Sequence, residues 1–108
     1  INFSILLAGS KEIRILNKKF RKKDKSTDVL SFPFYTTADI KKFKNENVYL
    51  GDIILNFYKI DKKNFKKDFN RLWVHGFLHL LGYKHYKNKD YYKMNRIEKL
   101  ILKKIENN

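Results

Sequence analysis

The chain has 108 residues and a formal net charge of +14, from 25 Lys and Arg against 11 Asp and Glu. This length suits one small domain, and the absence of cysteine excludes disulfides, thiol nucleophiles and cysteine-based metal sites. The charge favours a polyanionic partner, with nucleic acid ahead of an anionic membrane surface. No apolar run reaches the ~20 residues that span a bilayer. We therefore expect a soluble, cytoplasmic protein that does not act at a membrane.

The first third of the chain predicts a strand followed by a helix. Residues 3–8 are apolar, which is typical of a short buried strand. Ser10 follows Gly9 and predicts an N-cap, because its hydroxyl can accept a hydrogen bond from the first turn of a helix. Basic residues crowd the end of this helix, where cations suit the helix dipole. Its predicted core face consists of Ile13, Leu16 and Phe20.

The middle third predicts two strands that flank a polar segment. Residues 27–34 are β-branched and aromatic, and Pro33 near their end indicates an edge strand or a strand terminus. Residues 35–47 are polar and lysine-rich without a clear period, so an exposed loop is predicted there. Residues 48–57 predict a second strand, with a bulge at Gly51.

The last third predicts two helices. Apolar residues recur at spacings of three and four over residues 65–80, and Gly82 is a natural stop for this helix. A final helix is predicted over residues 90–105, with a core face of Met94, Ile97, Ile101 and Ile105. We therefore predict an α+β fold with residues 1–108 as one domain. A small mixed sheet of three or four strands packs against helices, and the helix of residues 65–80 is central.

All three histidines of the chain fall in one window, at His75, His79 and His85. Two histidines four residues apart project from one face of a helix, at the separation that two imidazoles need to bind one ion. A sharp turn at Gly82 brings the third histidine back toward them. Three protein ligands leave the fourth position of zinc open, as in catalytic sites. Imidazole also suits copper, iron and nickel, but the open geometry favours a single zinc ion.

The spacing of the histidines is also that of the elongated zinc motif of metzincin peptidases, with one exception. The residue after the first histidine is Gly76, where those peptidases carry the glutamate that acts as general base. The glycine therefore argues against a peptidase mechanism. A second interpretation of Gly76 is structural, as a point where a neighbouring strand packs closely against the helix.

The histidine window reads His-Gly-Phe-Leu-His-Leu-Leu-Gly-Tyr-Lys-His and resembles the signature of the YbeY family, His-Gly-x-Leu-His-Leu-x-Gly-Tyr-Asp-His. Two other blocks of that family resemble residues 16–33 and 50–53, and its C-terminal helix resembles the region of Met94 and Glu98. The family consists of bacterial ribosomal RNA maturation factors described as zinc-dependent single-strand endoribonucleases. The resemblance covers nearly the whole chain, but we expect no counterpart of the family's opening strand and helix in it.

Lys84 departs from this pattern, because the family has aspartate beside its last histidine. An aspartate at this position adds negative charge near the metal or orients a metal ligand by accepting a hydrogen bond from it. A lysine at the same position places a cation near the metal instead. Two consequences are open. Either metal affinity or activity is expected to be lower than in relatives, or Asp52 is expected to take over the role of that aspartate.

The resemblance implies a YbeY-like metal-dependent hydrolase domain with a zincin-like arrangement around a central metal-binding helix. The implied function is a zinc-dependent endoribonuclease in ribosome biogenesis, which processes the 3′ end of 16S ribosomal RNA. The implied partners are single-stranded regions of ribosomal RNA and the small ribosomal subunit. In this interpretation the metal ligands are His75, His79 and His85, and the catalytic residues are these three histidines and Arg21.

Arg21 stands at the position of the family's functional arginine, by the same resemblance. A guanidinium suits the negative charge that grows on phosphoryl oxygens, because it offers paired donors and stays protonated. Only four of the 25 basic residues are arginine, so an arginine in so lysine-rich a chain indicates a specific requirement. The alternative is that Arg21 caps the end of a helix or pairs with Asp24.

Other residues are candidates for the RNA site, with core packing or a solvated face as the alternative for each. Lysines are expected to contact backbone phosphates and aromatic rings to stack unpaired bases. These candidates are Lys22, Lys23, Lys25, Phe34, Tyr35 and Tyr83. Asp52 is a candidate general base only by its place in a strand. The histidines are expected to open into a cleft bordered by the Arg21 turn and by residues 31–33.

Two alternative functions remain open at this point. A metallopeptidase-like hydrolase is favoured by the histidine spacing and opposed by Gly76. A non-catalytic ribosome-assembly factor would use its basic surface and keep zinc for its structure, and Lys84 is compatible with that role.

Overall fold

A three-stranded sheet forms the centre of the protein. The computed structural model describes residues 1–42, 47–84 and 88–107. In the order β1-β3-β2, the strands are β1 (Asn2–Ala8), β3 (Tyr49–Asn56) and β2 (Val29–Pro33). β3 pairs in parallel with β1 and antiparallel with β2, so the sheet is mixed and β2 is an edge strand, as predicted. The predicted α+β fold is confirmed.

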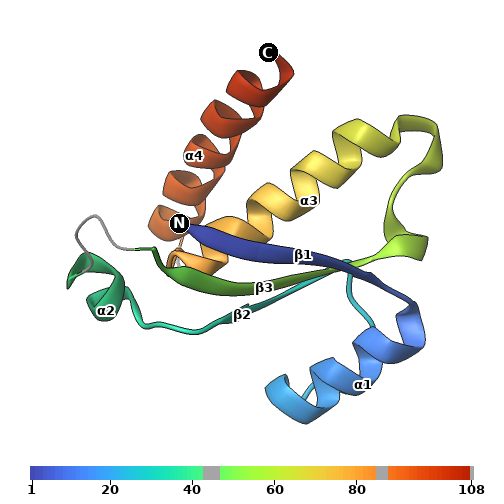
Figure 1. Ribbon diagram of the computed structural model, residues 1–108. Coiled ribbons are helices and arrows are strands. Elements are labelled where there is room, and N and C mark those ends of the chain that lie inside the picture. Colours follow the sequence, from blue (N-terminus) through green and yellow to red (C-terminus); the bar gives the residue numbers. More distant parts are fainter. Residues whose placement is uncertain (43–46, 85–87, 108) are drawn as a thin grey trace.

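Helices cover both faces of the sheet (Figure 1). On one face lies α1 (Ser10–Arg21), and on the other lies α3 (Phe65–Leu80), with α4 (Asn88–Glu106) packed against α3. A short helix follows β2, and two 3-10 turns connect β3 to α3; they are α2 (Thr37–Lys42), η1 (Phe57–Lys59) and η2 (Lys62–Asn64). Because α3 contacts both the sheet and α4, it is the central helix that the sequence predicts.

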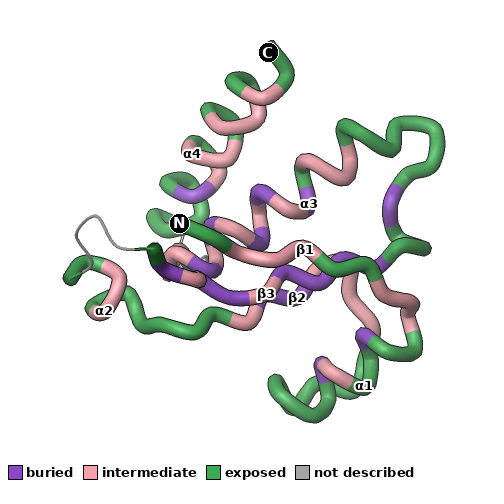
Figure 2. The backbone as a smooth tube through the Cα atoms, in the orientation of Figure 1, coloured by how far each residue is buried: buried purple, intermediate pink, exposed green. Residues whose placement is uncertain are grey.

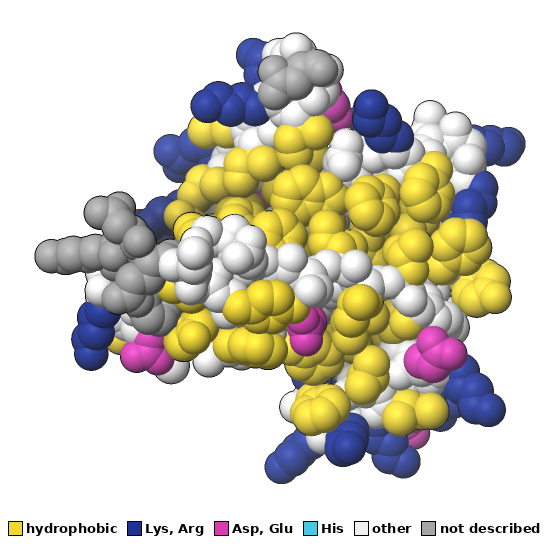
Figure 3. Space-filling model, in the orientation of Figure 1, with side chains coloured by type: hydrophobic (Ala, Val, Ile, Leu, Met, Phe, Trp, Pro, Cys, Tyr) yellow, Lys and Arg dark blue, Asp and Glu magenta, His cyan; other side chains and the backbone are white. Residues whose placement is uncertain are grey.

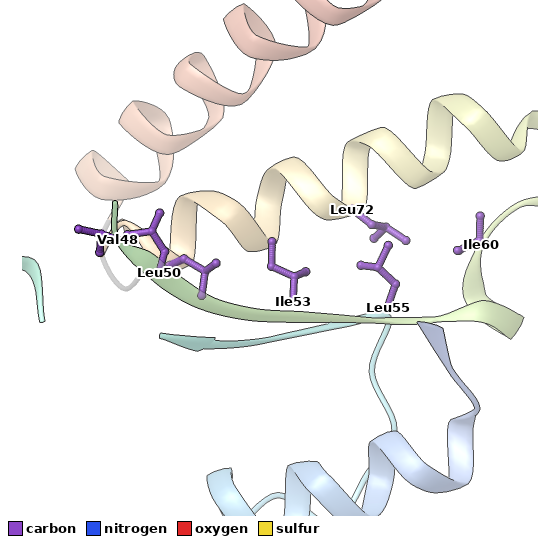
Figure 4. Close-up of a cluster of buried hydrophobic side chains, with 7 residues drawn as sticks. Val48, Leu50, Ile53, Leu55, Ile60 and Leu72 are labelled. Carbon is purple, nitrogen blue, oxygen red and sulfur yellow. The ribbon is translucent and has the colours of Figure 1, made fainter. Parts of the chain in front are cut away.

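The larger hydrophobic core lies between β3 and α3 (Figure 4). It consists of Val48, Leu50, Ile53, Leu55, Ile60, Leu72 and Leu80. Figure 2 shows buried positions along both β3 and α3. A smaller core of Ile13, Leu30 and Ile54 joins α1 to the opposite face of the sheet. Each buried aliphatic side chain contributes ~1.5–3 kcal/mol, so the two cores together hold α1 and α3 on opposite faces.

The predicted core faces of the outer helices are only partly confirmed. In α1, Ile13 is buried and Leu16 is half-buried, but Phe20 is 59% exposed and packs edge-on against Phe32. In α4, Met94 is buried, and the three predicted isoleucines that follow it are half-buried. The apolar period therefore identifies the face of each helix, but burial decreases toward the ends that extend past the sheet.

A bulge interrupts the pairing of β1 with β3, as predicted from Gly51. Asn2 pairs with Tyr49 but Ser4 pairs with Asp52, so β3 holds one extra residue at this point. Gly51 has a φ of 144°, and a Cβ there would lie 2.2 Å from the carbonyl oxygen of Phe32. Only glycine accepts both the backbone conformation and this close approach.

The predicted exposed loop of residues 35–47 is wrong in its first part, because α2 occupies Thr37–Lys42. The reason is a reciprocal cap at the start of the helix. The Asp39 N–H donates to Thr36 Oγ1 at 3.1 Å, and the Thr36 N–H donates to Asp39 Oδ2 at 3.3 Å. The lysines give this segment no apolar period, but its Thr-x-x-Asp spacing is a helix-start signal.

The predicted N-cap at Ser10 is also wrong, because Gly9 occupies that position and Ser10 is already helical. The Gly9 N–H donates to Glu12 Oε2 at 3.0 Å, which satisfies it at the start of the helix. The hydroxyl of Ser10 instead accepts from Nδ2 of the buried Asn56 at 2.9 Å. A tertiary contact therefore takes the hydroxyl that local rules assign to the cap.

Hydrophobic side chains gather on the face shown in Figure 3, over α3, α4 and β1. Phe3 of β1 packs against Trp73 and Phe77 of α3, with ring centroids 6.0 Å and 5.0 Å away. Leu6 and Leu7 are about half exposed on the same strand, at 50% and 51%. Within the described ranges, no helix is long and apolar enough to cross a membrane.

Candidate metal centre and cleft

Two of the predicted ligands, His75 and His79, meet on one side of α3. Their Nε2 atoms lie 3.1 Å apart, and their rings are nearly perpendicular, with an interplanar angle of 81°. Both residues are half-buried. The one-turn spacing of the sequence is thus realised as a convergence of two nitrogen atoms on one point.

The other ring nitrogen of each histidine is held by an oxygen. The Nδ1–H of His79 donates to the carbonyl of Tyr83 at 2.8 Å, and Nδ1 of His75 lies 2.5 Å from Glu98 Oε1 on α4. Because a carbonyl and a carboxylate only accept, these contacts place the protons on Nδ1. When both imidazoles are neutral, the lone pairs of their Nε2 atoms then face each other.

Facing lone pairs repel unless a proton or a cation lies between them. A tetrahedral zinc ion with Zn–N distances of ~2.0–2.1 Å holds two nitrogen ligands ~3.3 Å apart, close to the observed 3.1 Å. An oxygen acceptor behind each metal-binding imidazole is also the usual support of such ligands. His75 and His79 therefore fit a zinc ion in both their nitrogen spacing and their outer contacts.

The chain reverses direction after α3, as predicted from Gly82. The Tyr83 N–H donates to the carbonyl of Leu78, and the Gly82 N–H donates to that of His79, both at 3.0 Å. Gly82 has a φ of 99°, and a Cβ there would lie 2.1 Å from Thr37 Oγ1. This is a Schellman ending with glycine at its left-handed position.

The third predicted ligand, His85, lies outside the described residues. Within the part of the chain that the structure describes, no group of three or more His, Cys, Asp or Glu side chains gathers around one point. The two described histidines thus supply two of the three predicted ligands.

A cleft of about 470 Å³ opens beside His79 and holds Arg21. Ser31 and Pro33 of the edge strand β2 line it, as do Lys23 and Lys84. Arg21 comes from the end of α1, which packs on the opposite face of the sheet from α3. The end of α1 therefore borders the same cleft as His79, beside the edge strand β2. This is the cleft that the sequence predicts, bordered by the Arg21 turn and residues 31–33.

The turn that carries Arg21 is held by its neighbours. Lys22 ends α1 in the left-handed conformation, with a φ of 58°, and buried Asn17 donates from Nδ2 to the carbonyl of Lys25 at 2.9 Å. Nε of Arg14 donates to Asp24 Oδ1 at 2.7 Å, and this hydrogen bond lowers the pKa of Asp24. The alternative interpretation pairs Arg21 with Asp24, but in the structure Asp24 pairs with Arg14.

Asp52 lies on the wrong face of the sheet for a role at the histidines. Its pairing partner on β2, Phe32, packs in the core beneath α1, whereas the next pair, Ser31 and Ile53, faces α3. The Asp52 carboxylate instead accepts from the Tyr49 hydroxyl at 2.5 Å, which raises the pKa of Tyr49. The interpretations of Asp52 as general base or as substitute for the family's aspartate are therefore wrong.

Gly76 packs directly against the sheet, which confirms its structural interpretation. A Cβ at this position would lie 2.7 Å from Ile53 Cγ2 and 3.0 Å from Ser31 Oγ. The Ser31 hydroxyl also donates to the Gly76 carbonyl at 2.9 Å. A glutamate at this position would collide with both strands, so the catalytic base of a metzincin has no room here.

Sequence reasoning missed the contact of Glu98 with His75. The two residues are 23 positions apart and lie on different helices, so no local pattern connects them. The resemblance includes Glu98 but assigns it no role. A carboxylate on the half-buried side of α4, one turn after buried Met94, is the only available signal, and it is weak.

Comparisons with known proteins agree with this arrangement. The model of the family described as Endoribonuclease YbeY matches residues 1–106. The Endoribonuclease YbeY of Pelagibacter ubique is 47% identical over 112 residues, which cover 98% of this chain and 71% of that protein. Its namesake from Fusobacterium nucleatum is 33% identical, over 92% of this chain and 64% of that protein.

A solved structure is also similar. The solution structure of TM1509 from Thermotoga maritima has a TM-score of 0.59 and 28% identity, covering 94% of this chain and 66% of that one. The chain thus spans about two thirds of the length of the relatives it matches. Because the family model matches almost every residue, the chain belongs to the endoribonuclease YbeY family.

Proposed function

We propose that this protein is a zinc-dependent endoribonuclease that cleaves single-stranded regions of ribosomal RNA. One observation carries the proposal. The Nε2 atoms of His75 and His79 converge to 3.1 Å at the side of a cleft that also contains Arg21. Membership of the endoribonuclease YbeY family supports the same reaction.

In this proposal His75, His79 and His85 hold the zinc ion. When bound, zinc supplies Lewis-acid chemistry at a phosphate oxygen and at water. Glu98 and the Tyr83 carbonyl orient the first two imidazoles through their Nδ1 atoms, so that Nε2 is presented to the ion. The chain's own residues therefore fix the tautomer and the orientation of these two imidazole rings.

Arg21 binds the phosphoryl group in the same proposal. Its guanidinium is exposed in the cleft and can donate two parallel hydrogen bonds to phosphate oxygens. Such donors stabilise the negative charge that grows in the transition state. Lys23 and Lys84 add positive charge to the same walls and would hold the RNA backbone without reading its sequence.

We further propose that the substrate is the 3′ end of 16S ribosomal RNA and that the protein acts in ribosome biogenesis in the cytoplasm, at the small subunit. The net charge of +14 supports a polyanionic substrate of this kind. The peptidase alternative lacks support, because Gly76 stands where the base of that reaction is needed and is enclosed by the sheet.

The test compares cleavage of a single-stranded RNA by zinc-loaded wild-type protein with that by His79→Ala and Arg21→Ala variants. We expect His79→Ala to lose zinc and cleavage together. Arg21→Ala should keep its zinc and lose roughly 100-fold to 1,000-fold in cleavage rate. Arg96→Ala, an exposed arginine of α4, is the matched control and should retain wild-type cleavage.

Circular dichroism confirms that each variant is folded before its rate is compared. Wild-type cleavage by folded His79→Ala would contradict the proposal and indicate a contaminating nuclease. Ribosome association without any RNA cleavage would favour the assembly-factor alternative instead.

A further inference from the structure

A small cavity of about 260 Å³ lies between α3 and α4, and the His75 ring forms one of its walls. The other walls come from one face of α4, at Tyr91, Met94, Asn95 and Glu98. These positions follow the three- and four-residue spacing that brings side chains together on a helix. The same His75 ring presents its Nε2 to that of His79, 3.1 Å away. A group bound in this cavity therefore lies beside the proposed metal site.

The side-chain amide of Asn95 is a hydrogen-bonding group that the fold leaves unused. Asn95 is half-buried, and no described residue forms a hydrogen bond with its side chain. Polar side-chain atoms of the described residues that are shielded from solvent all have partners, so the Asn95 amide is reachable from the cavity. It offers an acceptor oxygen and a donor NH₂ group in one plane.

Glu98 places a second acceptor in the same cavity. Its Oε1 atom lies 2.5 Å from Nδ1 of His75, and a carboxylate accepts further hydrogen bonds through its other oxygen. Tyr91 adds an aromatic ring, and this residue is 53% exposed. The cavity thus combines an aromatic surface with one amide and one carboxylate, which is a set of groups that recognises the edge of a nucleobase.

We propose that this cavity binds the nucleobase next to the phosphodiester at the histidines and favours cytosine and adenine. Both bases carry an amino group beside a ring nitrogen that accepts. The Asn95 amide donates to the ring nitrogen and accepts from the amino group, and the Glu98 carboxylate accepts the second amino hydrogen. Uracil and guanine present a carbonyl oxygen at that place, and this oxygen would face the carboxylate. The proposal rests on the proposed function and deepens it, because it names the bases preferred beside the cleaved bond.

The test compares two short single-stranded oligonucleotides with 2′-O-methyl sugars, equal length and equal charge. One contains only cytosine and the other only uracil, so the rings have the same size and differ at the edge that the cavity reads. Zinc-loaded wild-type protein at neutral pH should bind the cytosine oligonucleotide about tenfold more tightly. This ratio corresponds to ~1.4 kcal/mol and lies within the range for a paired contact to one base edge. Fluorescence anisotropy gives both dissociation constants.

Asn95→Leu keeps the approximate size of the side chain but removes its donor and its acceptor. We expect this variant to bind cytosine as weakly as uracil, with unchanged affinity for uracil and for zinc. Asn95→Ala should behave in the same way, and it guards against a steric effect of leucine. Asn107→Leu is the matched control, because Asn107 is exposed just after α4 and does not line the cavity. It should keep the full preference.

Equal binding of the two oligonucleotides by wild-type protein would overturn the proposal. A cytosine preference that survives in folded Asn95→Leu and Asn95→Ala would overturn it as well, because the base would then be read elsewhere. Failure of the proposed function has a different signature, which is cleavage that does not depend on His79. A protein that prefers cytosine through Asn95 but does not cleave RNA would keep this subsite and lose the endoribonuclease proposal.

Discussion

The Glu98 carboxylate of α4 lies 2.5 Å from Nδ1 of His75 on α3, across 23 residues of sequence. Both side chains are largely shielded, with exposed fractions of 32% for His75 and 19% for Glu98. The contact ties the last helix to the helix that carries the proposed metal ligands. It also fixes which nitrogen of His75 faces His79, and this determines whether an ion can bind there.

Removal of the Glu98 carboxylate should weaken zinc binding. Without an acceptor at Nδ1, the His75 ring loses its fixed tautomer and direction, so we expect Glu98→Ala to lower zinc affinity roughly 10-fold to 100-fold. Glu98→Gln keeps an acceptor oxygen but removes the charge, and its loss should be smaller. Competition with a chromophoric chelator measures both affinities. Glu106→Gln, at the exposed end of the same helix, is the control, and equal zinc affinity in all variants would refute the role of Glu98.

Replacement of Lys84 by the aspartate of the family pattern should move two measurements in opposite directions. A carboxylate beside the metal site should raise zinc affinity, because it attracts the ion. Loss of a cation from the cleft wall should weaken RNA binding and reduce the slope of log K against log salt by about one.

Lys99→Asp is the matched control for this substitution, because Lys99 is exposed on α4 and does not line the cleft beside His79. It should leave zinc affinity unchanged. If Lys84→Asp changes neither zinc affinity nor the salt slope, the departure from the family pattern has no effect on the site.

A methyl group at Gly76 should destabilise the fold. An alanine in an exposed helix interior usually stabilises relative to glycine, but here its Cβ would lie 2.7 Å from Ile53 Cγ2. We therefore expect Gly76→Ala to lower the free energy of unfolding by about 1–3 kcal/mol, measured by urea denaturation. At Gly9, where the nearest atom to an added Cβ is 3.5 Å away, the same substitution should cost less. An unchanged or raised stability of Gly76→Ala would show that the neighbouring strands can move apart to accommodate the added methyl group.

Asp68 should make stability depend on pH. Burial raises the pKa of its carboxyl, but hydrogen bonds from the Asp61 N–H and from Arg71, each at 2.9 Å, lower it more, so the net pKa is below the ordinary value of 3.8. A depressed folded pKa contributes stability above the unfolded pKa, and this contribution is lost as pH falls through the folded pKa.

Asp68→Asn should therefore lower stability by about 1 kcal/mol at neutral pH. The difference from wild type should shrink as the pH falls below the ordinary value of 3.8, and it should vanish at still lower pH, where the carboxyl of the folded protein is protonated too. Urea denaturation at several pH values measures this difference. Asp90→Asn, at an exposed position of α4, is the control and should show a smaller change with pH. A difference that stays constant down to acid pH would exclude the carboxyl as its source.

The sequence was sufficient to predict a feature when all the residues that define it lie in or next to one helix or strand. The four-residue spacing of His75 and His79 places both imidazoles on one face of any helix. Gly51 and Gly82 mark positions that only glycine tolerates, because each has a positive φ and a neighbour where a Cβ would be. The bulge, the helix stop and the pair of converging nitrogens were therefore all predictable from the sequence.

Local rules failed where a distant residue competes for the same group. Ser10 has the side chain of a helix cap, but Asn56 takes its hydroxyl. Asp52 stands in a family block, but the bulge and the strand alternation turn it toward α1 and away from the histidines. Such outcomes depend on which face of the sheet each helix covers, and the sequence pattern of a single strand does not specify that.

The sequence by itself determined the fold class, the family and the two described histidines as a pair, because periodicity and spacing are properties of single elements. Only the tertiary structure decided what surrounds that pair. Glu98 reaches His75 because α4 packs on α3, and Arg21 reaches the same side because α1 ends beside the edge of β2. Contacts between elements far apart in the chain form when their apolar faces are buried together, so the polar residues that this burial brings to the histidines appear only in the folded chain.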